Sequence, residues 1–565
     1  MESTIKTDVV IVGAGPTGLA LACQFVRYGV DFVVIEKNSG VTPYSKAIGV
    51  QARTLELYEQ LGIAKDAVDQ GAIGAKGRFL VGGEVRGEVD FSSIGEGLSP
   101  YPFVLMLEQS KNEGLLYKYL LNHGKDVLWN TQLEHFHQID SGVTVKSRNS
   151  DGAAQVIEAR YLVGCDGARS PVRHALNLRF GGSTFERMFF VADAQVDWQF
   201  SHDALHICLA KESFVVFFPL KGNQRYRIVG VFPEEFAKEE GDVLYEEIEQ
   251  RIKQEAQLDL DVHDVEWFST YKVHTRHVNK FSLGRCFLAG DSAHVHSPAG
   301  AQGMNTGIQD SYNLAWKMAL VLEGADEKLL DTYNEERLEN AKNLLQTTDR
   351  MFQLVASPEW YVSFIRMNVF PQIAKYLFKS DAVKHFIFPI VSQIGINYRH
   401  SSLSDHKDDE NFKVKAGDRM PYFVVDGKSV FDLLHEPKFH WLVFSEQRYD
   451  LDELKKTMAD RYRDLVDVQS LSLSAEATGA FGCAESLAVL LRPDNYIGRI
   501  TGDTSHVALT SFLDRLGGSD KLFSLTQRNT TSFKAYRTSD STKAGARCPR
   551  SPAICFVNSP LVTGS

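Results

Sequence analysis

The chain has 565 residues, of which 44% are hydrophobic and 24% charged, the composition of a folded globular protein. Its formal net charge of −11 argues against a nucleic-acid partner, because nucleic-acid binders carry a basic excess. At about 150 residues per domain, this length predicts three or four domains. No apolar run approaches the ~18 residues of a membrane-spanning helix, so no membrane partner is expected. The 7 cysteines are scattered and lack metal-ligand spacing, which predicts reduced thiols, a cytoplasmic location and no metal site.

The N-terminal segment predicts a strand, a glycine-rich turn, a helix and a second strand. Residues 7–12 and 30–36 are short, apolar and β-branched, whereas residues 19–28 are apolar on most helical faces. The turn has the sequence GAGPTG and contains Gly13, Gly15, Pro16, Thr17 and Gly18. Such a turn lets the backbone approach a pyrophosphate at a helix N-terminus. Glu36, followed by Lys37, ends the second strand and can accept hydrogen bonds from ribose hydroxyls. The segment therefore predicts a dinucleotide site, with a purely structural βαβ turn as the alternative.

Two later segments repeat the pattern of a strand followed by a polar turn. Residues 159–164 predict a strand that runs into CDGARS, which contains Asp166. Residues 285–289 predict another strand, and it runs into Asp291 and a glycine-rich loop. A long helix follows, predicted from about residue 304 to 323, and Gly303, Met304 and Asn305 stand at its start. An acid at a strand end can bind a polyol, and a helix N-terminus can face a developing negative charge.

Together these motifs resemble the group A FAD-dependent aromatic hydroxylases, the monooxygenases with the p-hydroxybenzoate hydroxylase or phenol hydroxylase fold. The motifs follow the family order over about residues 5–400, and the block AGDSAHVHSPAGAQGMNTGIQDSYNLAWK is its most specific part. The resemblance implies an α/β chain, α+β overall. It would have a Rossmann-type FAD-binding domain, an interleaved antiparallel-sheet substrate domain and a thioredoxin-like C-terminal domain, as in the polyketide hydroxylases.

The resemblance also implies roles for individual residues. Glu36 would bind the ribose of FAD, and Lys46 stands where the family usually has an arginine on the FAD phosphates. Gln109 and Asp291 would hold the ribityl chain, although Gln109 could be an ordinary polar residue at a helix start. Asp166 would serve both FAD and nicotinamide. Pro298 would lie beside the flavin and the substrate, and Met304 and Asn305 would hold the pyrimidine end of the isoalloxazine. The motif residues RTLE (53–56) resemble a helix start of the family.

In the implied reaction, FAD accepts a hydride from NADH or NADPH. The reduced flavin then adds O₂ to give a C4a-hydroperoxide, which hydroxylates an aromatic, phenolic or polycyclic substrate. The chemistry would be flavin-centred, and the sequence singles out no catalytic base. His294 and His296 are predicted to be structural. A flavoprotein oxidase, a flavin-dependent halogenase and a non-catalytic flavin-binding scaffold are the alternatives. The WxWxIP segment of the halogenases is absent from the sequence.

The predicted domain boundaries follow from the same pattern. Residues 1–180 and 281–400 would form the FAD-binding domain with a helical extension. Residues 181–280 would form the substrate-binding sheet, with strands in 206–220 and 226–232 whose Phe214, Phe217 and Phe218 line the pocket or belong to the core. Residues 410–525 would form the thioredoxin-like domain, without a CxxC motif, and residues 526–565 a disordered tail. A homodimer is left open.

Overall fold

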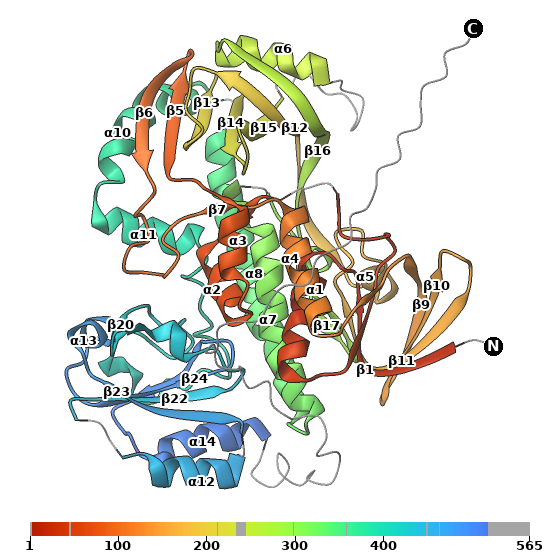
Figure 1. The fold of residues 1–565 in the computed structure, drawn as a ribbon, viewed down its shortest axis with the longest axis vertical. Coiled ribbons are helices and arrows are strands. Elements are labelled where there is room, and N and C mark those ends of the chain that lie inside the picture. Colours follow the sequence, from red (N-terminus) through yellow and green to blue (C-terminus); the bar gives the residue numbers. More distant parts are fainter. Residues whose placement is uncertain are drawn as a thin grey trace, which may run out of the picture. The chain divides into compact units, whose positions relative to one another are not determined.

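A computed structural model describes residues 3–43, 47–211, 213–232, 245–297, 299–356, 359–447, 450–462 and 464–517 (Figure 1). The predicted tail at 526–565 lies outside the described residues, as do Lys46 and Pro298. Within the described ranges, every helix is too short or too polar to cross a lipid bilayer.

The first large sheet has the spatial order β17-β18-β11-β1-β2-β8, and the β9–β10 hairpin extends it from β11. Its strands are β1 (Ser3–Val12), β2 (Phe32–Ile35), β8 (Val127–Leu128), β9 (Thr131–Ile139), β10 (Gly142–Asn149), β11 (Ala154–Gly164), β17 (Ser282–Leu283) and β18 (Cys286–Leu288). Strands β18, β11, β1, β2 and β8 run parallel. Val12 lies opposite both Ile35 and Gly164, and Gly164 lies opposite Leu288. The strand ends therefore meet at one edge of the sheet.

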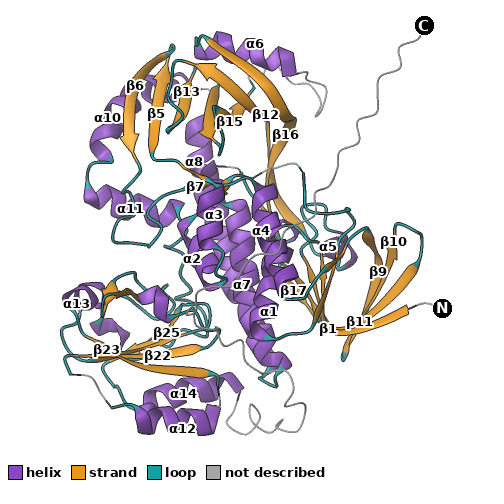
Figure 2. Cartoon of the chain, viewed as in Figure 1, coloured by secondary structure: helices purple, strands orange, loops and turns teal. Residues whose placement is uncertain are grey.

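Helices cover this parallel sheet, as expected when βα crossovers bury both of its faces. The helices of this part are α1 (Pro16–Tyr28), α2 (Ala52–Gln60), α3 (Ala64–Gln70), α4 (Gln109–Asn122), α5 (Pro171–Ala175), α7 (Gly303–Leu322) and α8 (Asp331–Ala356). Helices α1, α4 and α7 stand side by side next to the sheet (Figure 2). Consecutive α1 residues from Gly18 to Phe25 are all buried, so α1 is enclosed in the core.

The second large sheet has the order β19-β16-β12-β15-β14-β13-β5-β6 and is mostly antiparallel. Its strands are β5 (Lys76–Val81), β6 (Glu84–Asp90), β12 (Phe180–Trp198), β13 (Ala204–Leu209), β14 (Phe214–Pro219), β15 (Arg225–Val231), β16 (Leu260–Val278) and β19 (His294–Val295). Helix α6 (Tyr245–Ala256) covers one face, where Ile248 and Ile252 pack on the strands. Helices α9 (Trp360–Phe364), α10 (Phe370–Leu377) and α11 (Asp381–Val391) complete this part, and α10 packs on β6.

A mixed sheet of order β23-β22-β24-β25 forms the C-terminal part. The elements follow as β22 (Phe439–Ser445), α12 (Asp452–Tyr462), β23 (Val466–Ser472), α13 (Ala475–Phe481), β24 (Leu487–Leu491), β25 (Ile497–Thr501) and α14 (His506–Gly517). This βαβαββα order, with β23 parallel and β24 antiparallel to β22, is thioredoxin-like. Short pairs complete the fold: β3 (Gly49–Val50) and β4 (Ala72–Ile73) flank β7 (Leu105–Met106), and β20 (Val424–Val425) pairs with β21 (Lys428–Ser429).

Most predicted elements are confirmed, with shifted ends. The first strand and helix extend to β1 and α1, and the predicted helix at 304–323 is α7. The predicted strand region 206–220 forms two strands, β13 and β14, because the chain reverses between them, where the backbone N–H of Ala210 donates to the backbone oxygen of Ser213. Strands β5 and β6 come from residues 76–90, inside the range assigned to the FAD-binding domain, yet they extend the second sheet. The domain boundaries themselves remain predictions.

A buried ion cluster joins α2 to the C-terminal part. The carboxylate of Glu56 accepts hydrogen bonds from Arg53 at 3.0 Å and from both Nε and Nη2 of Arg419 at 2.9 and 2.7 Å. Arg53 also donates to the backbone oxygen of Asp494 at 2.8 Å. Burial alone would raise the pKa of Glu56, but Arg419 and Arg53 hold it below its usual value. The RTLE segment thus holds the C-terminal part in place.

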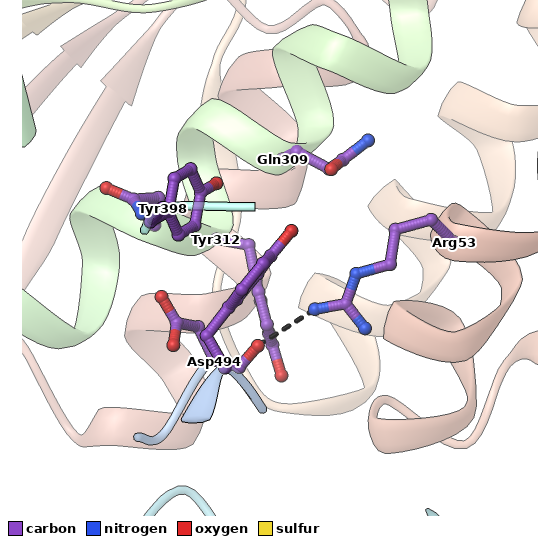
Figure 3. Close-up of a pocket in the computed structure, with 7 residues that line it drawn as sticks. Arg53, Gln309, Tyr312, Tyr398 and Asp494 are labelled. Atoms are coloured by element: carbon purple, nitrogen blue, oxygen red, sulfur yellow. Dashed lines mark hydrogen bonds between the residues drawn. The ribbon is translucent and has the colours of Figure 1, made fainter. Parts of the chain in front are cut away.

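A second buried cluster joins α7 and α8 to the same part. Glu336 accepts from Lys317 at 2.7 Å and from Arg492 at 2.6 and 3.0 Å, and Arg492 also pairs with Asp494. Burial lowers the pKa of Lys317 to about 8. Arg53, Gln309, Tyr312, Tyr398 and Asp494 line a small pocket in this seam (Figure 3), and the space among these side chains does not admit a water molecule. This seam is therefore packed structure rather than a ligand site.

We expect Glu56→Gln to lower the free energy of unfolding by about 3–5 kcal/mol, because it leaves Arg53 and Arg419 buried without their carboxylate. Denaturant unfolding measures the loss. The difference from wild type should persist above pH ~4.3, the ordinary pKa of Glu, and shrink as the pH falls through the lowered pKa. The matched control is Glu59→Gln on the same helix, because Glu59 is half-exposed and its change should cost less than about 1 kcal/mol. Equal losses in the two variants would contradict this account.

Candidate functional site

The candidate site lies at the carboxyl edge of the parallel sheet. The GAGPTG turn follows β1, Glu36 follows β2, Asp166 is the second residue after β11, and the Gly290–Ser292 turn follows β18. Segments that are far apart in the sequence are thus brought together by strand pairing alone. In open parallel sheets, ligands bind outside this edge.

Two glycines of the GAGPTG turn are required by close packing within the chain. Gly13 has a φ of +105°, and a Cβ there would lie 2.4 Å from the backbone oxygen of Cys165. A Cβ on Gly18 would lie 2.0 Å from the backbone oxygen of Gly13. These contacts press the turn after β1 against the turn after β11.

Gly15 differs, because a Cβ there would meet no atom of the described residues within 4 Å. Its φ of −72° and ψ of −175° are also open to other residues. Neither packing nor backbone conformation therefore explains a glycine at this position, the N-cap of α1. Close approach of a pyrophosphate to the backbone does explain it.

Thr17 connects the first turn to the third. A Cβ on Gly290 or on Gly307 would lie 2.4 Å from the Thr17 hydroxyl oxygen. Ser311 of α7 donates to the backbone oxygen of Thr17 at 2.7 Å. The start of α1, the turn after β18 and the first turns of α7 are therefore in direct contact.

Glu36 is fixed beside the glycine-rich turn. Its Oε2 accepts from the backbone N–H of Ala14 at 2.9 Å, and its Oε1 accepts from Asn38 at 3.0 Å. The side chain stays half-exposed, so it can accept further hydrogen bonds from a ligand. Lys37 is exposed.

The two predicted aspartates differ in environment. Asp166 Oδ2 accepts from the backbone N–H of Val172 at 3.0 Å, whereas its buried Oδ1 has no hydrogen-bond partner within the described ranges. Burial raises the pKa of Asp166, although bonds from Ser170 and Val172 oppose the shift. Asp291 is exposed in the turn after β18. Asp166 thus presents an acceptor that a ligand hydroxyl or amide would satisfy.

The start of α7 is held by the side chain of Asn305. Its Oδ1 accepts from the backbone of Gln51 at 2.9 Å and from Thr54 at 2.7 Å, and its Nδ2 donates to the backbone oxygens of Gly49 and Ala301. Asn305 is fully buried, and its side-chain amide is already hydrogen-bonded within the chain. The first N–H groups of a helix have no hydrogen-bond partner inside the helix, and they form the positive end of its dipole.

Gln109 and Met304 lie on neighbouring helix starts. Gln109 is the first residue of α4; it accepts from the backbone of Ala47 at 3.3 Å and donates to Glu113 at 2.9 Å. Met304 Sδ accepts from Asn112 of α4 at 3.2 Å. Gln109, Gly303 and Met304 are half-buried, as are Gly15, Pro16 and Thr17. These six predicted residues thus line accessible helix starts, whereas Gly13, Gly18 and Asn305 are buried.

Sequence reasoning missed a buried charge cluster beneath this edge. Asp310 of α7 accepts from the backbone of Gly290 at 2.9 Å, from His294 at 2.8 Å and from Arg337 of α8 at 2.5 Å. Burial alone would raise the pKa of Asp310, but Arg337 and His294 hold it below its usual value. Burial lowers the pKa of His296 to about 3, so this ring is neutral at physiological pH. The sequence signal that could have indicated this cluster is the helical spacing of charged residues, such as Asp310 and Lys317, within the otherwise apolar α7.

The described residues fit FAD. Gly15 leaves the backbone open at the N-terminus of α1, Glu36 stands at the adjacent strand end, and the Asp166 oxygen lacks a partner. The chain therefore offers a phosphate-binding helix start, a ribose acceptor and a second helix start at α7 along one edge.

Comparisons with known proteins agree with this geometry. The family model described as "FAD binding domain" matches residues 6–348. A flavin-dependent monooxygenase of Mycobacteroides abscessus is 34% identical over 87% of this chain and 97% of its own length. The 6-methylpretetramide 4-monooxygenase of Streptomyces rimosus is 30% identical over 89% of this chain and 92% of its own. The crystal structure of CabE, an aromatic hydroxylase from angucycline biosynthesis, superposes with a TM-score of 0.71 at 31% identity over 91% of this chain and 99% of that one.

The chain belongs to the FAD-binding family of flavin-dependent aromatic monooxygenases. It is an oxidoreductase with FAD as cofactor that uses NAD(P)H and O₂ to hydroxylate an aromatic compound. The resemblance carried by the sequence motifs is thereby confirmed.

We expect Gly15→Ala to raise the dissociation constant of FAD at least about tenfold, because a Cβ would separate the backbone from the pyrophosphate. The melting temperature of the apoprotein should stay unchanged, since no atom of the chain occupies that space. Titration of apoprotein with FAD, followed by flavin fluorescence, measures the change. Gly114→Ala in α4 is the matched control, because its Cβ also enters open space and FAD affinity should not change. A Gly15→Ala variant that binds FAD as tightly as wild type would contradict the assignment of Gly15 to the pyrophosphate site.

Proposed function

We propose that this monooxygenase hydroxylates a phenolic, multi-ring aromatic substrate. The observation that carries this proposal is the aromatic face of the second sheet, the face opposite α6. Alternation along the strands puts Phe214 and Phe218 on this face and Phe217 in the core under α6. Phe189 stacks on Tyr271 there, with ring centroids 5.9 Å apart. The names of two similar proteins, which refer to 6-methylpretetramide and to angucycline biosynthesis, support the same class.

This aromatic face is connected to the flavin-binding segments by contacts. Phe218 packs with Ile48 and Met106. A Cβ on Gly49 would lie 2.4 Å from the Cβ of Ala301, in the loop before α7. A substrate ring on this face would therefore lie next to the start of α7, which Pro298 shortly precedes in the sequence.

We assign the cofactor contacts as follows. The N-terminus of α1 with Gly13, Gly15, Pro16, Thr17 and Gly18 binds the pyrophosphate, and Glu36 binds the ribose, with Lys37 and Lys46 nearby in sequence. Gln109 and Asp291 hold the ribityl region, and Asp166 serves both FAD and the nicotinamide. The backbone of Gly303, Met304 and Asn305 binds the ring end.

The redox chemistry, hydride acceptance from NAD(P)H and activation of O₂, is what FAD supplies when bound. The chain supplies orientation and electrostatics. The N-terminus of α7 places backbone N–H groups and a positive dipole end where negative charge is stabilised. The aromatic face excludes water from the substrate ring. A phenol is a suitable substrate because its ring oxygen makes the neighbouring carbons electron-rich.

Three finer points are part of the proposal. Either NADH or NADPH serves as the hydride source and binds only transiently. The enzyme works in the cytoplasm. It is either a homodimer or a monomer. Size-exclusion chromatography with light scattering distinguishes the last two.

The experiment supplies the FAD-loaded enzyme with NADH or NADPH and a panel of phenols of increasing ring number. We expect multi-ring phenols to accelerate NAD(P)H oxidation and to gain one oxygen atom by mass spectrometry, because oxidation should be coupled to hydroxylation. The FAD-free protein is the control and should be inactive. Oxidation that no phenol accelerates, with all O₂ released as peroxide, would contradict the proposal. Turnover without NAD(P)H would indicate an oxidase, and halide incorporation a halogenase.

A further inference from the structure

An ion pair lies buried on the aromatic face of the second sheet. Asp193 of β12 and Arg227 of β15 are directly paired across the two strands. Arg227 Nε and Nη2 donate to the two carboxylate oxygens of Asp193, each at 2.6 Å. The side chains are only 1% and 8% exposed. The indole ring of Trp267 on β16 lies 5.6 Å from the guanidinium carbon.

The third guanidinium nitrogen of this pair is left without an acceptor. Arg227 Nη1 is buried and makes no hydrogen bond within the part of the chain that the structure describes. Buried polar groups nearly always have a partner, and leaving a charged donor without one is costly. The bidentate geometry with Asp193 fixes the plane of the guanidinium, so Nη1 is a preoriented donor.

Arg227 lies on the aromatic face of the second sheet, which is the proposed substrate side. Its strand neighbours Tyr226 and Ile228 belong to the core under α6, so Arg227 faces the opposite way. Phe218, paired with Arg227 across β14 and β15, packs on Ile48 and Met106. Arg225, two residues away on the same face, bonds Glu108 at 3.3 Å, immediately before Gln109. These contacts connect the face around Arg227 to the segments that line the flavin site.

The charge balance indicates the kind of group that Nη1 would bind. Asp193 already neutralises Arg227, so the pair has no net charge to compensate a carboxylate. A neutral hydrogen-bond-accepting oxygen on an aromatic ring, either a carbonyl or a phenolic hydroxyl, suits such a donor better. The ring itself would lie against Trp267 and the aromatic residues of the same face.

We propose that Arg227, held by Asp193, is a specificity-determining residue that donates a hydrogen bond from Nη1 to a ring oxygen of the aromatic substrate. This inference rests on the proposed function, because it takes the aromatic face as the substrate side. It adds a directional polar contact to a face that otherwise recognises substrates by apolar packing. The position of that oxygen on the substrate would then fix which ring carbon faces the start of α7.

The test measures binding rather than turnover. Oxidised, FAD-loaded enzyme is titrated with anthracene, anthraquinone, 1,8-dihydroxyanthracene and 1,8-dihydroxyanthraquinone, and flavin absorbance reports the dissociation constants. Anthraquinone tests the carbonyl and 1,8-dihydroxyanthracene tests the phenolic oxygen, each against anthracene. We expect wild type to prefer at least one oxygen-bearing ring to anthracene by about 10- to 100-fold, the range of a hydrogen bond to a charged donor.

Arg227→Lys retains the charge beside Asp193 but loses the forked donor, so the preference over anthracene should disappear. Asp193→Leu/Arg227→Met removes the pair without leaving a buried charge, and should remove the preference too if Arg227→Lys folds poorly. The matched control is Arg225→Lys, because the Arg225 nitrogens bond Glu108, Glu266 and the backbone of Lys221, and the preference should remain.

A wild type that binds no oxygen-bearing ring more tightly than anthracene would overturn the proposal. A variant that weakens all four ligands equally would also overturn it, because water alone would then be the partner of Nη1. The outcome is independent of hydroxylation: an enzyme that shows the preference but adds no oxygen to any phenol would contradict the proposed function and leave the role of Arg227 intact.

Discussion

The parallel pairing of β1 with β2 and β11, and of β11 with β18, is the constraint on which the site depends. Pairing in register stops these strands at one edge, so the turns that follow them meet. The glycines then determine how closely the turns approach. Gly13 and Gly18 let the first turn contact the second, and Gly290 and Gly307 leave room for Thr17. A single coenzyme can therefore be bound by segments nearly 300 residues apart because the backbone of one sheet brings them together.

Buried charge clusters attach the rest of the molecule to this edge. Asp310 connects α7 to α8 and to the turn at Gly290, Glu336 connects both helices to Arg492, and Glu56 connects α2 to Arg419. Each carboxylate is shared by at least two cationic or backbone donors, which satisfies it in an apolar surrounding. The thioredoxin-like part therefore holds α2, α7 and α8 in place, and its Cys483 has no cysteine partner for redox chemistry among the described residues.

The sequence was informative where chemistry depends on neighbours along the chain. The strand–turn–helix at GAGPTG, the strand before Asp166 and the helix start at Met304 could be predicted because hydrophobic periodicity and glycine spacing are local. Contacts between distant segments could not. The sequence around Asn305 does not indicate that its side chain hydrogen-bonds with Gln51 and Thr54. The sequence near residue 76 likewise does not indicate that β5 joins a sheet whose other strands come mostly after residue 180. Those facts depend on strand order, which one sequence does not encode locally.

The most direct test of the central claim is hydrogen–deuterium exchange of the apoprotein with and without FAD. If the paired strand ends hold one coenzyme, FAD should slow exchange together in residues 13–18, in the turn after β11 and at the start of α7, with the same dependence on FAD concentration. Protection confined to the first turn, or none at all, would contradict the account.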